Sequence, residues 1–281
     1  MSGQEFHIPV EENGEEIISL LEKQTGLGSE IIRDAFIKGA LWQGLKGKPK
    51  RLRDMEAKTI AGSTLFFNFN PKVLAEVPLP ARLIEDLNDY SIWYKPFGML
   101  SQGSRWSDHC TIYRWAEQHL EPLKPAFIVH RLDRAATGLI LLAHTNKAAA
   151  KLAALFQQRQ IDKRYSCIVH GKYPAKPEQR KIDLAIDDKP AISFVRRMEF
   201  DPETKRSLLE VSIDTGRKHQ IRRHLSATGF PVVGDRLYGR EGDSEDLQLT
   251  ATQLSFICPL DGTMRAFKLP DDLVPKLTIK Q

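Results

Sequence analysis

The residues whose types and spacing could support chemistry lie in three short segments of the second half of the chain. Residues 130–139 form a charged turn between two apolar runs, and residues 163–165 open a strand-like stretch. Residues 215–225 carry a strand end, a Gly turn and the start of a basic helix. These segments offer a carboxylate, a phenol and several guanidinium groups, which can stabilise or attack a cationic centre and move a proton. A single Asp, Tyr or Arg of this kind is usually structural, so the signal lies in the combination.

Apolar runs and turns predict the framework that would position these segments. Residues 127–131 and 137–143 flank the first segment and predict buried strands, because they are rich in apolar and β-branched side chains. Residues 146–158 place Ala and Leu on one stripe and predict a helix. The same reasoning predicts a helix near 111–119 and further strands at 90–95, 164–170, 207–213 and 249–257. Since several strands follow one another directly, we expect an α+β fold with a mixed, largely antiparallel sheet and flanking helices.

The first 75 residues have a pattern of their own. Helical periodicity predicts helices at 15–23 and 30–38, with Ser29 as the N-cap of the second and Gly39 ending it. Two short strands and the basic loop between them are expected at 40–42, 64–69 and 46–53. This order resembles the S4-type RNA-binding module, although the alternative is a small helical appendage with no binding role. The resemblance implies RNA contacts from the loop residues Lys48, Lys50, Arg51 and Arg53.

Proline spacing suggests where this module ends. Three prolines between residues 71 and 82 predict a linker at 76–85. We therefore expect a small S4-like domain over 1–75 and a larger domain over 86–281 that carries the three segments.

Composition and charge limit the class of protein. The chain has 281 residues, with 41 Lys and Arg against 36 Asp and Glu, and the basic residues cluster near glycines and aromatics, which favours a polyanionic partner. No apolar run approaches the length of a membrane span, and the N-terminus lacks a secretory pattern. Three widely spaced cysteines fit neither a disulfide framework nor a metal knuckle. We expect a cytoplasmic protein that does not enter a membrane.

Together, the three segments resemble the RluA-type family of RNA pseudouridine synthases. The family carries His-Arg-Leu-Asp followed by Thr-Ser-Gly-Leu, then a basic-Tyr pair, then Thr-Gly-Arg-x-His-Gln-Ile/Leu-Arg-x-His-Leu and a later Gly-Asp. The resemblance covers about residues 90–269 and keeps the family's order. It departs at Ala135 and Ala136, where the family has an acidic and a hydroxyl side chain. Because Asp133 is kept, we expect this departure to affect loop packing and substrate fit more than activity.

The resemblance implies that uridine in RNA is isomerised to pseudouridine. The C1′–N1 bond breaks, the base turns and C1′ joins C5, with cationic character developing on the sugar. Asp133 is implied as the catalytic carboxylate, Arg222 as its bidentate ion-pair partner, and Tyr165 as the ring on which uracil stacks. No metal or cofactor is expected, since the leaving base is also the incoming nucleophile and no nucleotide-binding motif is present. Two alternatives stay open: whether Asp133 attacks C1′ or deprotonates C2′, and whether Asp133 or Tyr165 removes the C5 proton.

Basic residues near the motifs are implied in RNA binding. The target base must be flipped out of its helix, and Arg131 matches the family residue that fills the vacated space. Further RNA contacts are expected from Arg134, Arg217, Lys218 and Arg223. We expect His130, His219 and His224 to be structural or to contact the RNA backbone, because the family uses none of them as acid or base.

Two other function classes are possible. A non-catalytic RNA-binding or ribosome-assembly factor could share the fold, but would have no need to retain Asp133, Tyr165 and Arg222 together. A small-molecule N-glycosidase is disfavoured by the dispersed basic surface and the N-terminal module. The preferred interpretation is an RNA pseudouridine synthase that acts as a monomer on ribosomal or transfer RNA.

Overall fold

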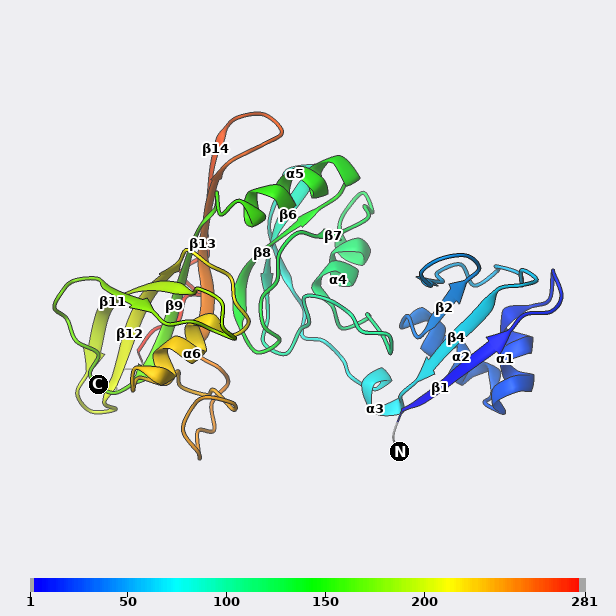
Figure 1. The fold of residues 1–281 in the computed structure, drawn as a ribbon, viewed down its shortest axis with the longest axis horizontal. Coiled ribbons are helices and arrows are strands. Elements are labelled where there is room, and N and C mark those ends of the chain that lie inside the picture. The colour runs from blue at the N-terminus through cyan, green and yellow to red at the C-terminus, as the bar shows by residue number, and fades with distance from the viewer. Residues whose placement is uncertain (1–2, 278–281) are drawn as a thin grey trace. The chain divides into compact units, whose positions relative to one another are not determined.

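The computed structural model describes residues 3–277, which form two compact units (Figure 1). The first unit contains the chain up to Pro78 together with Gln102–Gln118. The second contains Leu79–Ser101 together with the chain from His119 onward.

A four-stranded antiparallel sheet in the order β1-β4-β2-β3 forms the first unit. Its elements are β1 (Gln4–Pro9), α1 (Ile17–Thr25), α2 (Ser29–Ile37), β2 (Leu41–Gly44), β3 (Lys50–Arg51), β4 (Thr64–Phe69) and α3 (Pro71–Leu74). Both longer helices are amphipathic and bury Leu21, Ile32 and Phe36 in one core with Leu41 and Phe67 of the sheet. Most of α4 (Ile112–His119) also belongs to this unit.

The helices and strands predicted for this unit are present, with differences at their ends. The N-cap of α2 is Gly28, so the assignment of Ser29 as N-cap is wrong. Gly39 follows α2 in the left-handed region (φ 84°), and a Cβ there would lie 2.3 Å from a carboxylate oxygen of Asp108. β1 was not predicted, because of its six side chains only Ile8 is fully buried and the apolar pattern is weak.

The second unit is built on a ten-stranded sheet. The strand order is β10-β11-β12-β9-β13-β8-β6-β5, with β7 paired to β8 and β14 to β13. The strands are β5 (Arg82–Asp86), β6 (Tyr90–Lys95), β7 (Phe127–Ile128), β8 (Thr137–Ala143), β9 (Asp162–His170), β10 (Arg180–Asp183), β11 (Ile192–Asp201), β12 (Arg206–Ile213), β13 (Leu249–Ile257) and β14 (Met264–Lys268). Every pairing between these strands is antiparallel except that of β13 with β8. The predicted α+β class with a mixed, largely antiparallel sheet is confirmed.

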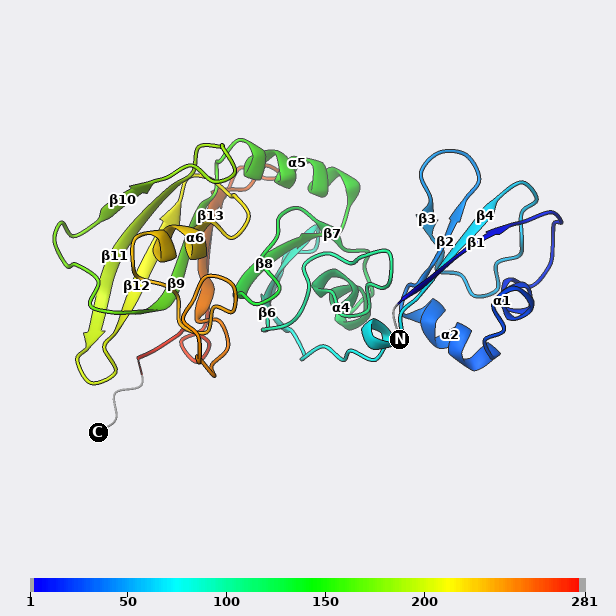
Figure 2. The ribbon, with the colours of Figure 1, turned by 60° about the horizontal axis from the view of Figure 1, so that its bottom comes forward.

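Two helices pack on this sheet (Figures 1 and 2). α5 (Asn146–Gln157) lies against β7 and β8 and buries Ala148 and Leu152. α6 (Gln220–Ala227) lies against β11 and buries Ile221 and Leu225. Their apolar stripes form separate clusters, one under each helix.

Sequence patterns located the central strands better than the edges. β8 and β13 have the predicted bounds, whereas β7 covers only two of the residues predicted at 127–131. β5 occupies the end of the stretch 76–85, for which a linker was expected, and it pairs with β6. Four of its five side chains are exposed, so this edge strand shows little hydrophobic pattern.

The expectations about membrane spans and cysteines can be compared with the described residues. Within 3–277, no helix is long and apolar enough to cross a membrane. The three cysteines all lie in this range, are buried, and form no disulfide.

Candidate active site

Asp133 lies in the loop between β7 and β8, and its two neighbours are held by hydrogen bonds. The Ser101 hydroxyl donates to the Leu132 carbonyl (2.8 Å) and accepts from the Leu132 N–H (3.0 Å). The carbonyl of Arg134 accepts from the Lys95 ammonium (3.2 Å). The backbone on both sides of Asp133 is therefore fixed by the last residue of β6 and by the segment that follows it.

Lys95 is the most buried cation near this loop. It has no exposed surface and also donates to the carbonyls of Pro96 (3.1 Å) and Met99 (2.8 Å). Burial lowers the pKa of Lys95 to about 7, while the negative charge of Asp133 opposes this shift. Lys95 thus ties the turn after β6 to the loop that carries Asp133.

Strand register brings Tyr165 towards the same loop. Gly138 of β8 pairs with Ala251 of β13, and Ala251 pairs on its other side with Tyr165 of β9. A Cβ on Gly138 would lie 2.2 Å from the Ala251 carbonyl oxygen, and Gly138 has φ 107°, so a glycine is needed for this close approach. The Gly of the first motif therefore lets β8 and β9, which carry the first and second motifs, lie on the two sides of β13.

The third motif builds the start of α6. The Gln220 side-chain oxygen accepts from the Thr215 hydroxyl (2.7 Å) and the Arg217 N–H (3.1 Å). Its amide nitrogen donates to the Ile192 carbonyl of β11 (2.9 Å). These bonds anchor the loop before α6 to the sheet and so set the position of Arg222 in the first turn.

Arg222 lies between two carboxylates. Its Nη1 is 3.2 Å from Asp133 Oδ2, while its Nε and Nη2 donate to the two oxygens of Asp235 at 2.8 and 2.7 Å. The side chains of Arg222 and Asp235 are 5% and 0% exposed, against 26% for Asp133. The predicted contact with Asp133 is present, but the predicted bidentate fork is formed with Asp235 instead.

The charges in this group stabilise one another. Burial disfavours the charged form of Arg222, but the hydrogen bond and charge of Asp235, followed by those of Asp133, raise its pKa. Burial likewise disfavours ionised Asp235, but the hydrogen bond from Arg222 and two backbone N–H donors lower its pKa. Arg222 and Asp235 are therefore a fixed ion pair next to the more exposed Asp133.

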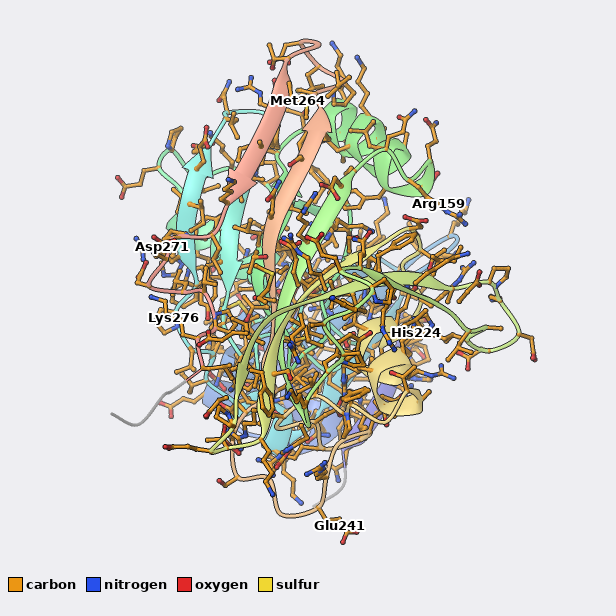
Figure 3. The ribbon with its side chains drawn as sticks, turned by 90° about the vertical axis from the view of Figure 1, so that its left-hand side faces the viewer. Arg159, His224, Glu241, Met264, Asp271 and Lys276 are labelled. Carbon is orange, nitrogen blue, oxygen red and sulfur yellow. The ribbon has the colours of Figure 1, made fainter. Side chains whose placement is uncertain are left out.

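A cavity of about 220 Å³ opens at Asp133. Its walls combine charged, polar and apolar side chains, contributed by Phe97, Asp133, Arg134, Ala135, His219, Arg222, Gly234, Asp235, Arg236, Leu237 and Leu247. Several of these come from the loop between α6 and β13, on which Figure 3 labels Glu241; the same view labels His224 on α6. Ala135, where the chain departs from the family motif, is part of the wall. The cavity can hold a flat polar ring against apolar surface with a carboxylate at one side.

Tyr165 is half-buried and packs with the apolar cluster under α6. It is not among the lining residues of the cavity. Burial, followed by the negative charge of Asp133, raises the pKa of its phenol, so Tyr165 is protonated near neutral pH. The structure therefore places Tyr165 within the electrostatic influence of Asp133.

The three motif histidines have different environments. His130 Nε2 accepts from the Leu141 N–H (2.9 Å), and burial lowers the pKa of His130 to about 3. His224 is buried and hydrogen-bonds to β11, so both of these histidines have structural environments. His219 instead lines the cavity, with Nε2 3.8 Å from Asp133 Oδ1.

The basic residues predicted near the pocket differ in exposure. Arg131, Arg134 and Lys218 are exposed, and Arg134 also lines the cavity. Arg217 is half-buried and its Nε donates to a carbonyl just before β11 (3.1 Å), while Arg223 forms an ion pair with an aspartate of the β10–β11 loop (3.0 Å).

In the first unit, two of the four predicted loop residues are engaged inside the unit. Arg51 Nη1 lies 2.8 Å from Asp108 Oδ1, and Arg53 contacts the other oxygen of the same buried carboxylate. Lys48 and Lys50 are exposed. Arg51 and Arg53 thus share one counter-charge within the unit, and Arg53 is exposed together with the two lysines.

Several residues at the site were not assigned a role from the sequence. Asp235 was visible only as the end of the Gly-Asp that closes the third motif. Lys95 and Ser101 gave no signal, because their partners are backbone carbonyl and N–H groups of distant segments. Within residues 3–277, no group of three or more His, Cys, Asp or Glu side chains could hold a metal ion.

Comparisons with known proteins agree with this geometry. A family model for RNA pseudouridylate synthase matches residues 89–227. The dual-specificity RNA pseudouridine synthase RluA of Vibrio parahaemolyticus is 32% identical over 203 residues, covering 65% of this chain and 80% of that protein. The ribosomal large subunit pseudouridine synthase D of Nitrosomonas europaea is 31% identical over 225 residues, covering 71% and 65% respectively.

Solved structures show the same fold. The human RNA pseudouridylate synthase domain containing 1 superposes with a TM-score of 0.59 at 21% identity, covering 69% of this chain and 85% of that one. Human RNA pseudouridylate synthase domain containing 4 gives 0.55 at 22% identity, covering 68% and 89%. The family model, the sequence relatives and the fold agree: this chain belongs to the RluA family of RNA pseudouridine synthases, which are isomerases.

Proposed function

We propose that this protein converts specific uridines of structured RNA, ribosomal or transfer RNA, into pseudouridine. The observation that carries the proposal is the arrangement of Asp133, which borders a cavity while Arg222, fixed by Asp235, contacts one of its oxygens. The name of one relative specifies the large ribosomal subunit and that of another dual specificity, which supports an RNA substrate.

The chemistry needs only one reactive carboxylate. The electrons of the C1′–N1 bond leave with N1, and Asp133 stabilises or traps the cationic sugar. After the base turns, C5 bonds to C1′, the C5 proton is lost and N1 ends protonated, so the composition of the nucleotide is unchanged. Arg222 contacts one oxygen of Asp133 and holds that carboxylate in place. Tyr165, whose phenol feels the charge of Asp133, is proposed to act as a hydrogen-bond donor and packing surface for the bound nucleotide.

Access to Asp133 requires a flipped nucleotide, because a paired base cannot enter the cavity. Flipping costs a few kcal/mol. Arg131 is exposed two residues before Asp133 and is proposed to occupy the space that the base leaves. The apolar side chains of Phe97 and Leu237 in the cavity wall offer surface to the flipped ring.

RNA binding away from the cavity is proposed to rest on backbone charge. Arg134 and Lys218 are exposed near the pocket, while Arg217 and Arg223 are partly engaged in protein contacts. In the S4-like domain over residues 1–75, the basic loop exposes Lys48 and Lys50, whereas its exposed Arg53 contacts Asp108. Such contacts position RNA without selecting a sequence.

A deletion strain tests the proposal. Pseudouridine is mapped in ribosomal and transfer RNA by a pseudouridine-specific chemical readout, with and without plasmid-borne wild type or Asp133→Asn. We expect one or more sites to disappear on deletion, to return with wild type and to stay absent with Asp133→Asn. A complete set of modifications in the deletion strain would support a non-catalytic binding factor instead. Incubation of the enzyme with free uridine and uridine monophosphate tests the glycosidase alternative, for which free uracil would be the product.

A further inference from the structure

His219 has an unusual position at the active-site cavity. It is the N-cap of α6 and adopts the left-handed region with φ 55°, which is uncommon for a residue with a Cβ. Strained backbone of this kind persists where the surrounding structure imposes it and is frequent at functional sites. Its side chain is 16% exposed and lines the cavity beside Asp133.

Both ring nitrogens of His219 face defined groups. Nδ1 lies 3.1 Å from the hydroxyl of Tyr238, and Nε2 lies 3.8 Å from Asp133 Oδ1. The Tyr238 ring meets the imidazole edge to face, and the Arg222 guanidinium lies 5.2 Å from the centre of that ring. Tyr238 is therefore held between Arg222 and His219, with its hydroxyl on the imidazole.

Burial is the main reason that His219 is neutral near neutral pH. Burial lowers its pKa; Asp133 opposes this, Arg222 and Lys218 reinforce it, and Asp235 again opposes it. A neutral imidazole carries one proton, and the partner of one nitrogen decides which nitrogen holds it. When the Tyr238 hydroxyl donates to Nδ1, the proton is on Nε2 and points at Asp133.

The two carboxylate oxygens of Asp133 thus face different side chains. Arg222 contacts Oδ2 at 3.2 Å, and His219 faces Oδ1 at a distance longer than a hydrogen bond in this structure. Catalytic hydrogen bonds are often long in the absence of substrate and shorten in the bound complex. A neutral donor can orient a carboxylate without neutralising it, whereas a second cation would also weaken its reactivity.

We propose that His219 is a positioning residue for Asp133, with Tyr238 fixing the tautomer in which Nε2–H faces Oδ1, and that protonation of His219 slows the reaction as the pH falls. This role rests on the proposed pseudouridine synthase activity. It differs from an acid or base role, because His219 transfers no proton to the nucleotide.

Variants that differ in one feature of the imidazole test this role. His219→Asn tolerates the left-handed backbone but provides an amide only near the Nδ1 position. His219→Gln can place a non-titrating N–H donor near the Nε2 position. Tyr238→Phe removes only the hydroxyl that fixes the tautomer. His7→Gln, on the exposed face of β1, is the matched control.

Single-turnover rates are measured from pH 5 to 8.5 on RNA from the deletion strain. We expect His219→Asn to lower the rate at pH 7.5 about 10- to 100-fold with KM within twofold, as for a misplaced catalytic group. His219→Gln should keep most of the rate and lose the wild-type decline on the acid side. Tyr238→Phe should lower the rate less than His219→Asn, and His7→Gln should match wild type. An Asn variant with the wild-type rate, or one slowed equally at every pH with the acid decline unchanged, overturns the proposal.

Nuclear magnetic resonance of the histidine side chains gives a readout that does not depend on activity. The His219 signals are identified by their absence in His219→Gln. We expect a neutral ring at pH 7 with the proton on Nε2, a mixture of tautomers in Tyr238→Phe, and a lower pKa in Asp133→Asn, because the carboxylate that raises it is gone. A ring charged at pH 7, or protonated on Nδ1, overturns the proposal. If wild type modifies no RNA, the proposed function fails while these spectra still decide the His219 geometry.

Discussion

Replacing Asp235 with Asn tests whether this buried carboxylate, and not Asp133, fixes Arg222. Asp235 Oδ1 and Oδ2 accept two charge-assisted hydrogen bonds from Arg222, at 2.7 and 2.8 Å, and its side chain has no exposure. Asn can accept one of these bonds, but its amide nitrogen would face a guanidinium N–H. Losing one such bond costs about 1.5–3 kcal/mol.

The whole cost, of which this lost bond is a part, is that of a buried cation without its main counter-charge. Removing one partner of a buried ion pair destabilises a protein by about 3–5 kcal/mol. Asp133 stays 3.2 Å from Arg222, so the lower end applies. We expect the free energy of unfolding of the second unit to fall by about 3 kcal/mol. This lowers the protection of its amides against hydrogen exchange through global unfolding roughly a hundredfold.

Hydrogen–deuterium exchange of the amides of β9 and β12, read by mass spectrometry, measures this loss within the second unit alone. Asp133→Asn is the matched control, because it leaves the fork between Arg222 and Asp235 intact and alters a side chain that is 26% exposed. It should change protection by less than about 1 kcal/mol while abolishing activity. Equal protection in Asp235→Asn and wild type, or a larger loss in Asp133→Asn, would refute the reasoning.

Four further outcomes are expected. Arg222→Lys keeps a positive charge but loses the fork, so single-turnover rates should fall about 10²–10³-fold with the fold intact by circular dichroism; a wild-type rate would contradict this. Gly138→Ala forces a Cβ to 2.2 Å from the backbone of β13 and should prevent the second unit from folding, seen as loss of exchange protection and contradicted by wild-type protection. The pKa of His130 is about 3 in the folded chain against an ordinary value of 6.5, so the unfolded chain binds this proton first, and the free energy of unfolding should fall as the pH drops from about 6.5 towards 3. Urea titrations at a series of pH values should show that the free energies of unfolding of wild type and His130→Gln change differently with pH only in that window. Replacing Lys48 and Lys50 with Ala should lower the slope of log binding constant against log salt by about 1 to 2, whereas an unchanged slope would argue against RNA contacts by this loop.

The sequence predicted those parts of the fold in which side-chain pattern and environment agree. β8 and β13 are buried between neighbouring strands, so the apolar run of β8 and the alternating pattern of β13 gave their bounds directly. β1 and β5 have mostly exposed side chains, and their strand state depends on pairing with β4 and β6, which a local pattern does not contain. Arg51 and Arg53 were expected to contact RNA, and nothing local in the sequence indicates that both would instead contact the distant Asp108.

The candidate site shows the same division. Motif resemblance singled out Asp133 and Arg222, and the structure brings them to 3.2 Å. Which carboxylate forms the bidentate pair with Arg222 could not be predicted. It depends on whether the chain after α6 folds so that Asp235 reaches the same guanidinium group. Lys95 was missed for a related reason: three carbonyl acceptors define its role, and their convergence is a property of the folded loops.

Two carboxylates around one guanidinium also make chemical sense for a reaction in which Asp133 changes its charge. If Asp133 bonds to the sugar or accepts a proton, its negative charge is lost for that step. With Asp133 as its only partner, the 5%-exposed Arg222 would then be an uncompensated buried cation, at a cost of about 3–5 kcal/mol. Asp235, which is inaccessible to solvent, keeps Arg222 paired throughout. The buried carboxylate therefore holds the cation in place, and the more exposed one is left free to react.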